Sequence, residues 1–164
     1  MTIDERKDFS EQSAIDYLAN CFNASDSGIY GKAFEIGVKS FLNLNKGNSK
    51  HVSAKGKHDV TFHGMTFEIK SNCGEINDNI DTNNYIVYTM DNRHECYKPY
   101  NARVLTVEQF KALFYGLGLV RTKTSTSGAV KTTIQSYKNS KKKSLALARA
   151  LEQFETLEQF ASEH

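Results

Sequence analysis

Two acids and a lysine near the middle of the chain, Asp59, Glu68 and Lys70, have types and a spacing that could carry chemistry. They lie in the segment HDVTFHGMTFEIKS, residues 58–71, in which apolar and polar residues alternate on both sides of Gly64. Alternation with a period of two predicts two β-strands, each with one apolar and one polar face. All three ionisable side chains then belong to the polar face of one hairpin.

A turn at His63 and Gly64 would pair the apolar side chains of these two strands. The expected pairs are Phe62 with Met65 and Val60 with Phe67. The same register sets Asp59 opposite Glu68. A slip of one residue would mix the apolar and polar faces, so the pattern itself favours this pairing.

Two carboxylates that face each other across a pair of strands repel and destabilise the pair. A divalent cation removes the conflict, and two carboxylates form a partial shell for Mg²⁺, which keeps waters and takes phosphate oxygens as further ligands. The ammonium of Lys70, two residues from Glu68 on the same face, can orient a water or stabilise charge that develops on a phosphate. Acid, acid, lysine and metal together indicate hydrolysis of a phosphodiester. The alternative is a solvent-facing hairpin whose polar side carries these residues without a function.

Helical periodicity N-terminal to the hairpin predicts the elements that position it. We expect helices at about 10–23 and 29–43, and Glu35 lies at the margin of the apolar face of the second. Lys32 and Lys39 are expected on the opposite, solvated face of that helix. The inner face is expected to carry Tyr30, Phe34, Val38 and Phe41.

Strand patterns predict β-strands at about 51–55, 58–63, 65–71 and 84–90, with a polar loop between the last two. The segment RVLTVEQFKALFYGLG then predicts a short strand followed by a helix. Thr106 and Gln109 are placed for a capping box at the start of that helix.

The C-terminal part of the chain predicts a second hairpin at about 119–137, with STSG as its turn, and one helix at about 141–161. The apolar stripe of this last helix is interpreted as core packing rather than as a dimer seam. Its members are Leu147, Leu151, Phe154, Leu157 and Ala161.

Charge is distributed unevenly along the chain, although its net value is only +2. Residues 93–149 contain twelve Lys or Arg and two acids, whereas the remaining residues contain nine basic and seventeen acidic side chains. Such a division can present a basic surface to a polyanion. We expect the second hairpin and the residues after it to grip a nucleic-acid backbone, through Arg121, Lys123, Lys131, Tyr137, Lys138, Lys141 and Lys142. The alternative is a solvated hairpin with ordinary lysines.

Three short motifs, GKAFEIG, HDV and FEIKS, together resemble the PD-(D/E)XK nuclease superfamily over roughly residues 28–120. The resemblance implies a restriction endonuclease-like core in which Asp59 and Glu68 bind the metal and Lys70 is the catalytic lysine. It also implies that Glu35 is the helix acid found in many members and that the carbonyl of Ile69 completes the metal shell. His58 stands where the name of the family puts proline.

The sequence therefore predicts one α/β domain, residues 1–164, with a mixed sheet of four to five strands flanked by helices. The basic hairpin and C-terminal helix, about 119–161, extend the core. The expected function is a Mg²⁺-dependent endonuclease that acts on DNA, with Mn²⁺ as a substitute ion and RNA not excluded. The alternative is a non-catalytic DNA-binding or inhibitory protein of a mobile element that retains the nuclease fold. A homodimer is possible because two active sites can cut both strands.

Composition predicts a cytoplasmic protein with no membrane partner. No apolar run is long enough to cross a bilayer, and the N-terminal segment MTIDERKDFSEQ lacks the apolar stretch of a secretory signal. The three cysteines are widely spaced, and no two of them form a Cys-x-x-Cys motif. We therefore expect reduced thiols rather than disulfides or a zinc site.

Overall fold

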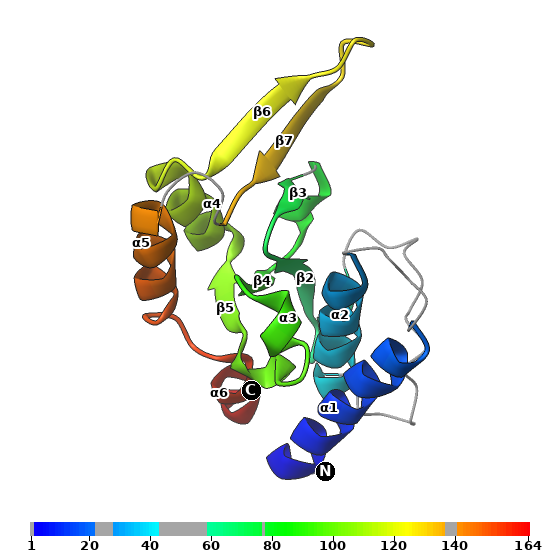
Figure 1. Ribbon diagram of the computed structural model, residues 1–164. Coiled ribbons are helices and arrows are strands. Elements are labelled where there is room, and N and C mark those ends of the chain that lie inside the picture. The colour runs from blue at the N-terminus through cyan, green and yellow to red at the C-terminus, as the bar shows by residue number, and fades with distance from the viewer. Residues whose placement is uncertain (1, 22–27, 43–58, 77, 137–140) are drawn as a thin grey trace.

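The computed structural model describes residues 2–21, 28–42, 59–76, 78–136 and 141–164. The strand expected at 51–55, and the predicted backbone contacts Tyr137 and Lys138, lie outside these ranges. The described chain is a mixed α/β fold whose centre is a four-stranded sheet with helices on both faces (Figure 1). This architecture confirms the expected α/β fold with a mixed sheet flanked by helices.

The central sheet has the strand order β1-β2-β4-β5. Its strands are β1 (Val60–Phe62), β2 (Met65–Ser71), β4 (Tyr85–Thr89) and β5 (Arg103–Thr106). β1 is antiparallel to β2, β2 is parallel to β4, and β4 is antiparallel to β5. The sheet is therefore mixed. β2 is an inner strand, and it carries both Glu68 and Lys70, which are two residues apart.

The β1–β2 hairpin has the predicted register. Val60 pairs with Phe67 and Phe62 with Met65. His63 and Gly64 form the turn with φ values of 48° and 80°. Positive φ at both central residues is the backbone of a type I′ turn, whose twist matches that of the two strands.

One face of the central sheet is covered by α1 (Ile3–Ala19), α2 (Gly28–Leu42) and α6 (Leu157–Glu163). Phe67 and Val87 of the sheet are fully buried there against Phe34 and Phe41 of α2. Phe67 also stacks on Tyr85 at 5.4 Å between ring centroids. The apolar residues of β2 therefore point toward the N-terminal helices, and Glu68 and Lys70 occupy the alternate positions of the strand.

The other face is covered by α4 (Val107–Gly116) and α5 (Lys141–Leu151). Ile86 and Leu105 of the sheet pack there with Phe110 and Phe114 of α4. The capping box predicted for α4 is present: Thr106 Oγ1 accepts from the Gln109 N–H, and Gln109 Oε1 accepts from the Thr106 N–H.

A second, three-stranded antiparallel sheet has the order β3-β7-β6. β6 (Val120–Thr124) and β7 (Val130–Ile134) are the predicted C-terminal hairpin, which projects away from the helices in Figure 1. β3 (Gly74–Ile76) and a 3₁₀ helix, η1 (Asp78–Thr82), lie where a polar loop was expected, so that expectation is wrong. β3 has too few apolar residues for a strand pattern and is ordered by its pairing with the distant β7.

The single helix expected at 141–161 is two helices, α5 and α6. Between them the chain is hydrogen-bonded to the outer edge of β5: the Val104 N–H donates to the Glu155 carbonyl at 2.9 Å. The Leu157 N–H likewise donates to the Ala102 carbonyl at 2.7 Å. These two bonds hold residues 155–157 extended along the sheet edge and prevent a continuous helix.

The expected apolar stripe of that helix is consequently divided between the two faces of the sheet. Leu147 and Leu151 of α5 pack on the α4 side, whereas Leu157 and Phe160 of α6 pack on the α1–α2 side. The chain crosses from one face to the other around β5. Thr156 caps α6 through a capping box with Gln159.

The remaining described elements are short. α3 (Asn92–Glu95) and a 3₁₀ helix, η2 (Pro99–Asn101), connect β4 to β5. All three cysteines are free thiols. Within the described ranges, none of the helices has the length and apolarity that a membrane span needs.

Candidate active site

The end of the β1–β2 hairpin carries Asp59, which lies one residue outside β1. Its backbone N–H donates to the Phe67 carbonyl at 2.9 Å. Its side-chain Oδ2 accepts from the Ile69 N–H at 2.7 Å. The carboxylate thus extends the ladder by one bond beyond the three paired residues of β1, and this bond fixes the side chain against β2.

Glu68 and Lys70 lie on the same face of β2, as the alternation predicts. Lys70 Nζ is 3.5 Å from Glu68 Oε1, and each side chain is only 14% exposed. The ion pair is therefore largely withdrawn from solvent, where its attraction is stronger than at the surface and its desolvation costs more.

α2 contributes a second charged pair, Glu35 and Lys39, spaced by one helical turn. Their Oε1 and Nζ atoms are 3.5 Å apart, and the Lys39 side chain is only 13% exposed. The expectation that Lys39 lies on a solvated face is wrong, because α2 is buried on most of its circumference. The spacing to Glu35 was the signal in the sequence that could have identified it.

The electrostatics show that these groups act on one another. Burial raises the pKa of the Asp59 carboxyl; the hydrogen bond from Ile69 lowers it, the charge of Glu35 raises it, and the charges of Lys39 and Lys70 lower it. Burial also raises the pKa of Glu68, and the charge of Asp59 is the next largest cause. Lys70 opposes that shift, but the net direction for both carboxyls is upward.

A cleft of about 320 Å³ opens between α2 and the segment joining β2 to β3. Glu35, Ile69 and Lys70, three of the predicted site residues, line it. Lys32 and the exposed thiol of Cys73 also line it, and the pattern of the sequence did not assign either to a site. The cleft gives a substrate access to the ammonium of Lys70.

The donor set at the hairpin suits a magnesium ion that is held only partly by the protein. Among the residues that the structure describes, no three His, Cys, Asp or Glu side chains form a group that could hold a metal ion. Mg²⁺ is commonly bound through one or two carboxylates, with water and substrate phosphates as its other ligands. Asp59 and Glu68 provide two such carboxylates, and burial opposes the ionisation of both.

Those of the predicted nucleic-acid contacts that the structure describes lie on the second sheet and on α5. In the β6–β7 ladder, Arg121 pairs with Thr133 and Lys123 with Lys131. Alternate residues share a face, so all three basic side chains lie on the same face of the hairpin, and all three are exposed. Lys131 Nζ also lies 3.6 Å from Glu75 Oε2 of β3.

Lys141 and Lys142, in the first turn of α5, are exposed as well. They stand at the N-terminal end of that helix, where the macrodipole repels cations. An anion bound nearby would relieve this repulsion. The described part of the predicted grip thus consists of three basic residues on one hairpin face and two on a helix terminus.

Comparison with protein-family models, with curated proteins and with solved structures finds no match for this chain. The resemblance of its short motifs to the PD-(D/E)XK nucleases therefore stays a prediction.

Proposed function

We propose that this chain is a Mg²⁺-dependent endonuclease that hydrolyses DNA and has a restriction endonuclease-like core. One observation supports this most directly: burial raises the pKa of two carboxyls, Asp59 and Glu68, beside the ammonium of Lys70, and the charge of Asp59 raises the pKa of Glu68 further. The order of α2 with its acid, followed by a hairpin with Asp59 and then Glu68-Ile69-Lys70, is the order that the family resemblance implies.

Asp59 and Glu68 would hold the magnesium ion, with the carbonyl of Ile69 as the further protein ligand. When bound, the ion would supply Lewis-acid stabilisation to a phosphodiester oxygen and lower the pKa of a coordinated water. The hydrogen bond from the Ile69 N–H holds the Asp59 carboxylate in place before any ligand arrives. A carboxylate fixed in this way needs little reorganisation at the moment of reaction.

Lys70 lines the cleft and carries its ammonium 3.5 Å from the Glu68 carboxylate. From there it can donate to an attacking water or to a phosphate oxygen on which negative charge develops. Glu35 lines the same cleft, and its charge acts on Asp59. It would accept a proton or a hydrogen bond from the attacking water, with Lys39 limiting its repulsion of the phosphate.

DNA would be held by the exposed basic face of the β6–β7 hairpin and by the first turn of α5. Contacts from Lys and Arg to phosphate oxygens carry affinity but no sequence information. The geometry therefore supports binding to the backbone of DNA, with RNA as a substrate of the same charge.

The second candidate is a DNA-binding or inhibitory protein that retains the fold without catalysis. One observation favours it: within the described residues no group of three metal-ligating side chains forms. Against it stands the complete set of two acids and a lysine.

Incubation of the chain with plasmid, branched and single-stranded DNA, and with RNA, in Mg²⁺ or in EDTA, separates the two candidates. We expect cleavage of DNA in Mg²⁺ and none in EDTA. Asp59→Ala and Lys70→Ala should each lower the cleavage rate by about 10²- to 10⁴-fold, the range for loss of a positioned acid–base group.

Asp16→Ala and Lys98→Ala serve as matched controls, because both side chains are exposed and lie outside the site. Circular dichroism and the unfolding midpoint establish that each variant is folded. Binding that weakens with salt, without cleavage of any substrate, would favour the second candidate. Cleavage that persists in EDTA or in Lys70→Ala would overturn the proposed mechanism.

A further inference from the structure

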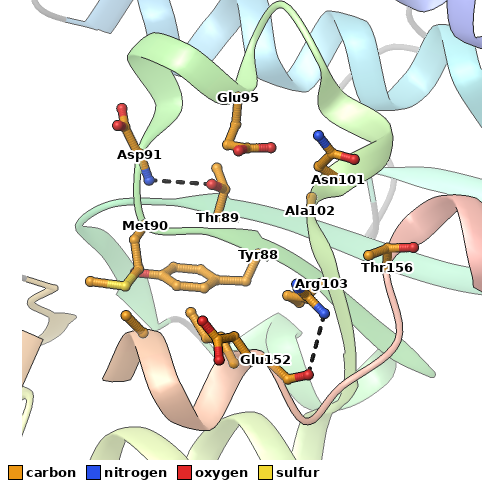
Figure 2. A pocket seen from close by; sticks show the side chains of 12 residues that line it. Tyr88, Thr89, Met90, Asp91, Glu95, Asn101, Ala102, Arg103, Glu152 and Thr156 are labelled. Carbon is orange, nitrogen blue, oxygen red and sulfur yellow. Dashed lines mark hydrogen bonds between the residues drawn. The ribbon is translucent and has the colours of Figure 1, made fainter. Parts of the chain in front are cut away.

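A second pocket, of about 370 Å³, lies at the carboxyl end of β4, beside the start of β5 and the end of α5 (Figure 2). It shares no lining residue with the cleft at Lys70. Its polar lining includes Thr89, Glu95, Arg103 and Glu152. None of these residues takes part in the function proposed above.

The break between α5 and α6 builds one wall of this pocket. The Arg103 side chain donates from Nη1 to the Phe154 carbonyl at 2.8 Å and to the Glu152 carbonyl at 3.5 Å. The guanidinium therefore donates to carbonyls of the segment that follows α5. These hydrogen bonds from Arg103 Nη1 to backbone carbonyls hold this wall of the pocket in place.

The contacts within the fold do not account for the position of the Glu95 carboxylate. It belongs to α3 and, as Figure 2 shows, points into the pocket, while Asp91 points away from it. Glu95 Oε2 is buried and has no hydrogen-bond partner among the described residues. A buried acceptor without a partner is costly and uncommon, so it indicates a group that is satisfied by something the described residues do not supply.

The neighbouring acid, Asp91, does not account for the position of Glu95, because the Asp91 carboxylate already has other hydrogen-bond partners. Its Oδ1 accepts from the N–H groups of Arg93 and His94, and its Oδ2 lies 2.7 Å from His94 Nδ1. Asp91 thus caps α3. Burial, followed by the charge of Asp91, raises the pKa of Glu95, while Arg103, His94 and Lys98 lower it.

The pocket carries net negative charge. Besides Asp91, which points away, two acids line it, Glu95 and Glu152, against one base, Arg103. An anionic ligand would meet this charge unfavourably. Bare metal binding is not supported either, since no group of three metal-ligating side chains occurs in the described part of the chain.

One side of the pocket is apolar. Met90, Ala148 and Leu151 line it, and Met90 lies below the Glu95 carboxylate in the view of Figure 2. An alkyl chain packed there would leave water, which is favourable by about 0.8 kcal/mol for each buried methylene. The volume lies within the range of small-molecule sites, about 300–1,000 Å³.

We propose that this pocket binds a small organic cation, a primary ammonium on a short alkyl stem. The ammonium donates to Glu95 Oε2 and the stem packs against Met90 and Leu151. This site is independent of the proposed nuclease centre.

The proposal is tested by titrating the ¹⁵N-labelled chain with n-butylammonium and following the backbone amide signals by NMR. The neutral n-butanol has a similar shape and serves as the control ligand. We expect signals of residues 88–95, 101–103 and 148–156 to shift with n-butylammonium. Butanol should bind about tenfold more weakly, because it cannot form a charge-assisted hydrogen bond to Glu95.

Glu95→Gln keeps the shape of the side chain and removes its charge, and it should weaken n-butylammonium binding about tenfold. Glu108→Gln, an exposed acid in the first turn of α4, is the matched control and should leave the affinity unchanged. The unfolding midpoint of Glu95→Gln verifies that the variant folds. Equal affinity of both ligands, equal affinity in Glu95→Gln, or shifts confined to residues 35, 59 and 68–70 would each overturn the proposal.

Discussion

The Asp59 carboxylate accepts a hydrogen bond that a longer β1 would have accepted through its backbone. The side chain is therefore held by the sheet and is also half-buried beside Glu68 and Lys70. The alternation of the hairpin predicted that Glu68 and Lys70 share one face of β2. It could not predict the bond to Ile69, because a pattern of polarity does not show where a strand stops pairing.

Glu68→Gln should stabilise the ligand-free chain at neutral pH. The pKa of Glu68 is raised above its ordinary 4.5 in the folded state, so folding favours the protonated carboxyl. Below the ordinary pKa both states are protonated and burial of the group costs nothing extra; as pH rises through the folded pKa, the buried charge lowers stability. Gln stays neutral throughout, so the gain at pH 7 is expected to be about 0.5–2 kcal/mol.

Urea unfolding in EDTA measures this difference in stability at pH 7 and at about pH 3. An ordinary carboxyl is protonated at about pH 3, so the difference should vanish there. In Mg²⁺ the order should reverse, because ligand binding stabilises the native wild type by about 2.7 kcal/mol at one hundred times the dissociation constant. A variant that is less stable than the wild type in EDTA would show that Glu68 is a structural ion-pair partner of Lys70.

At the scale of elements, the β6–β7 hairpin places Lys123 directly opposite Lys131. Like charges at paired positions destabilise a hairpin. Glu75 offsets the charge of Lys131, whereas no ion pair of Lys123 occurs among the described residues. Two lysines that face each other in this way are consistent with a surface that binds a polyanion.

Lys123→Ala should weaken DNA binding and reduce the slope of log K against log salt by about 1, since one phosphate contact is lost. Thr122→Ala, on the opposite face of the same strand, is the matched control. Fluorescence anisotropy with a labelled duplex at several salt concentrations measures both. An unchanged slope in Lys123→Ala would remove this residue from the DNA-binding face.

Thr156→Ala should lower the free energy of unfolding by about 1 kcal/mol, because it removes the N-cap of α6 and leaves a helix N–H without its partner. Thr156→Ser retains the hydroxyl and should behave as the wild type. Urea unfolding measures the difference. A loss as large in the Ser variant would assign the effect to packing of the methyl group rather than to capping.

The two capping boxes also show how far local sequence could predict the elements. TVEQ at 106–109 identified the start of α4, and TLEQ at 156–159 is the same signal at the start of α6. The second was missed because the apolar spacing across 141–161 continues through it. The helix breaks there through hydrogen bonds to β5, which are distant in the sequence. β3 was missed for the same reason, since its partner strand is β7.

At the scale of the whole molecule, the central sheet separates two apolar cores. Adjacent strands show this alternation: Phe67 of β2 faces α2, and Ile86 of β4 faces α4. Periodicity predicted that helices cover both faces. It could not divide α5 from α6, because residues of the same apolar type serve both cores.

Phe67→Ala and Ile86→Ala test whether the two cores unfold together. Each side chain is fully buried, so the losses should be about 3–5 and 2–5 kcal/mol. Because one sheet belongs to both cores, each variant should show a single transition, with fluorescence and circular dichroism coinciding. Two separate transitions in either variant would contradict a single domain.

The chain that runs along β5 between α5 and α6 also seals that border of the sheet. An open border strand offers unpaired backbone groups onto which a foreign strand can add, and this is a common start of aggregation. Here Glu155 and Leu157 hydrogen-bond to Val104 of β5 and to Ala102 directly before it, from within the same molecule. A neighbouring molecule therefore cannot pair a strand with this edge, and any self-association has to use another surface.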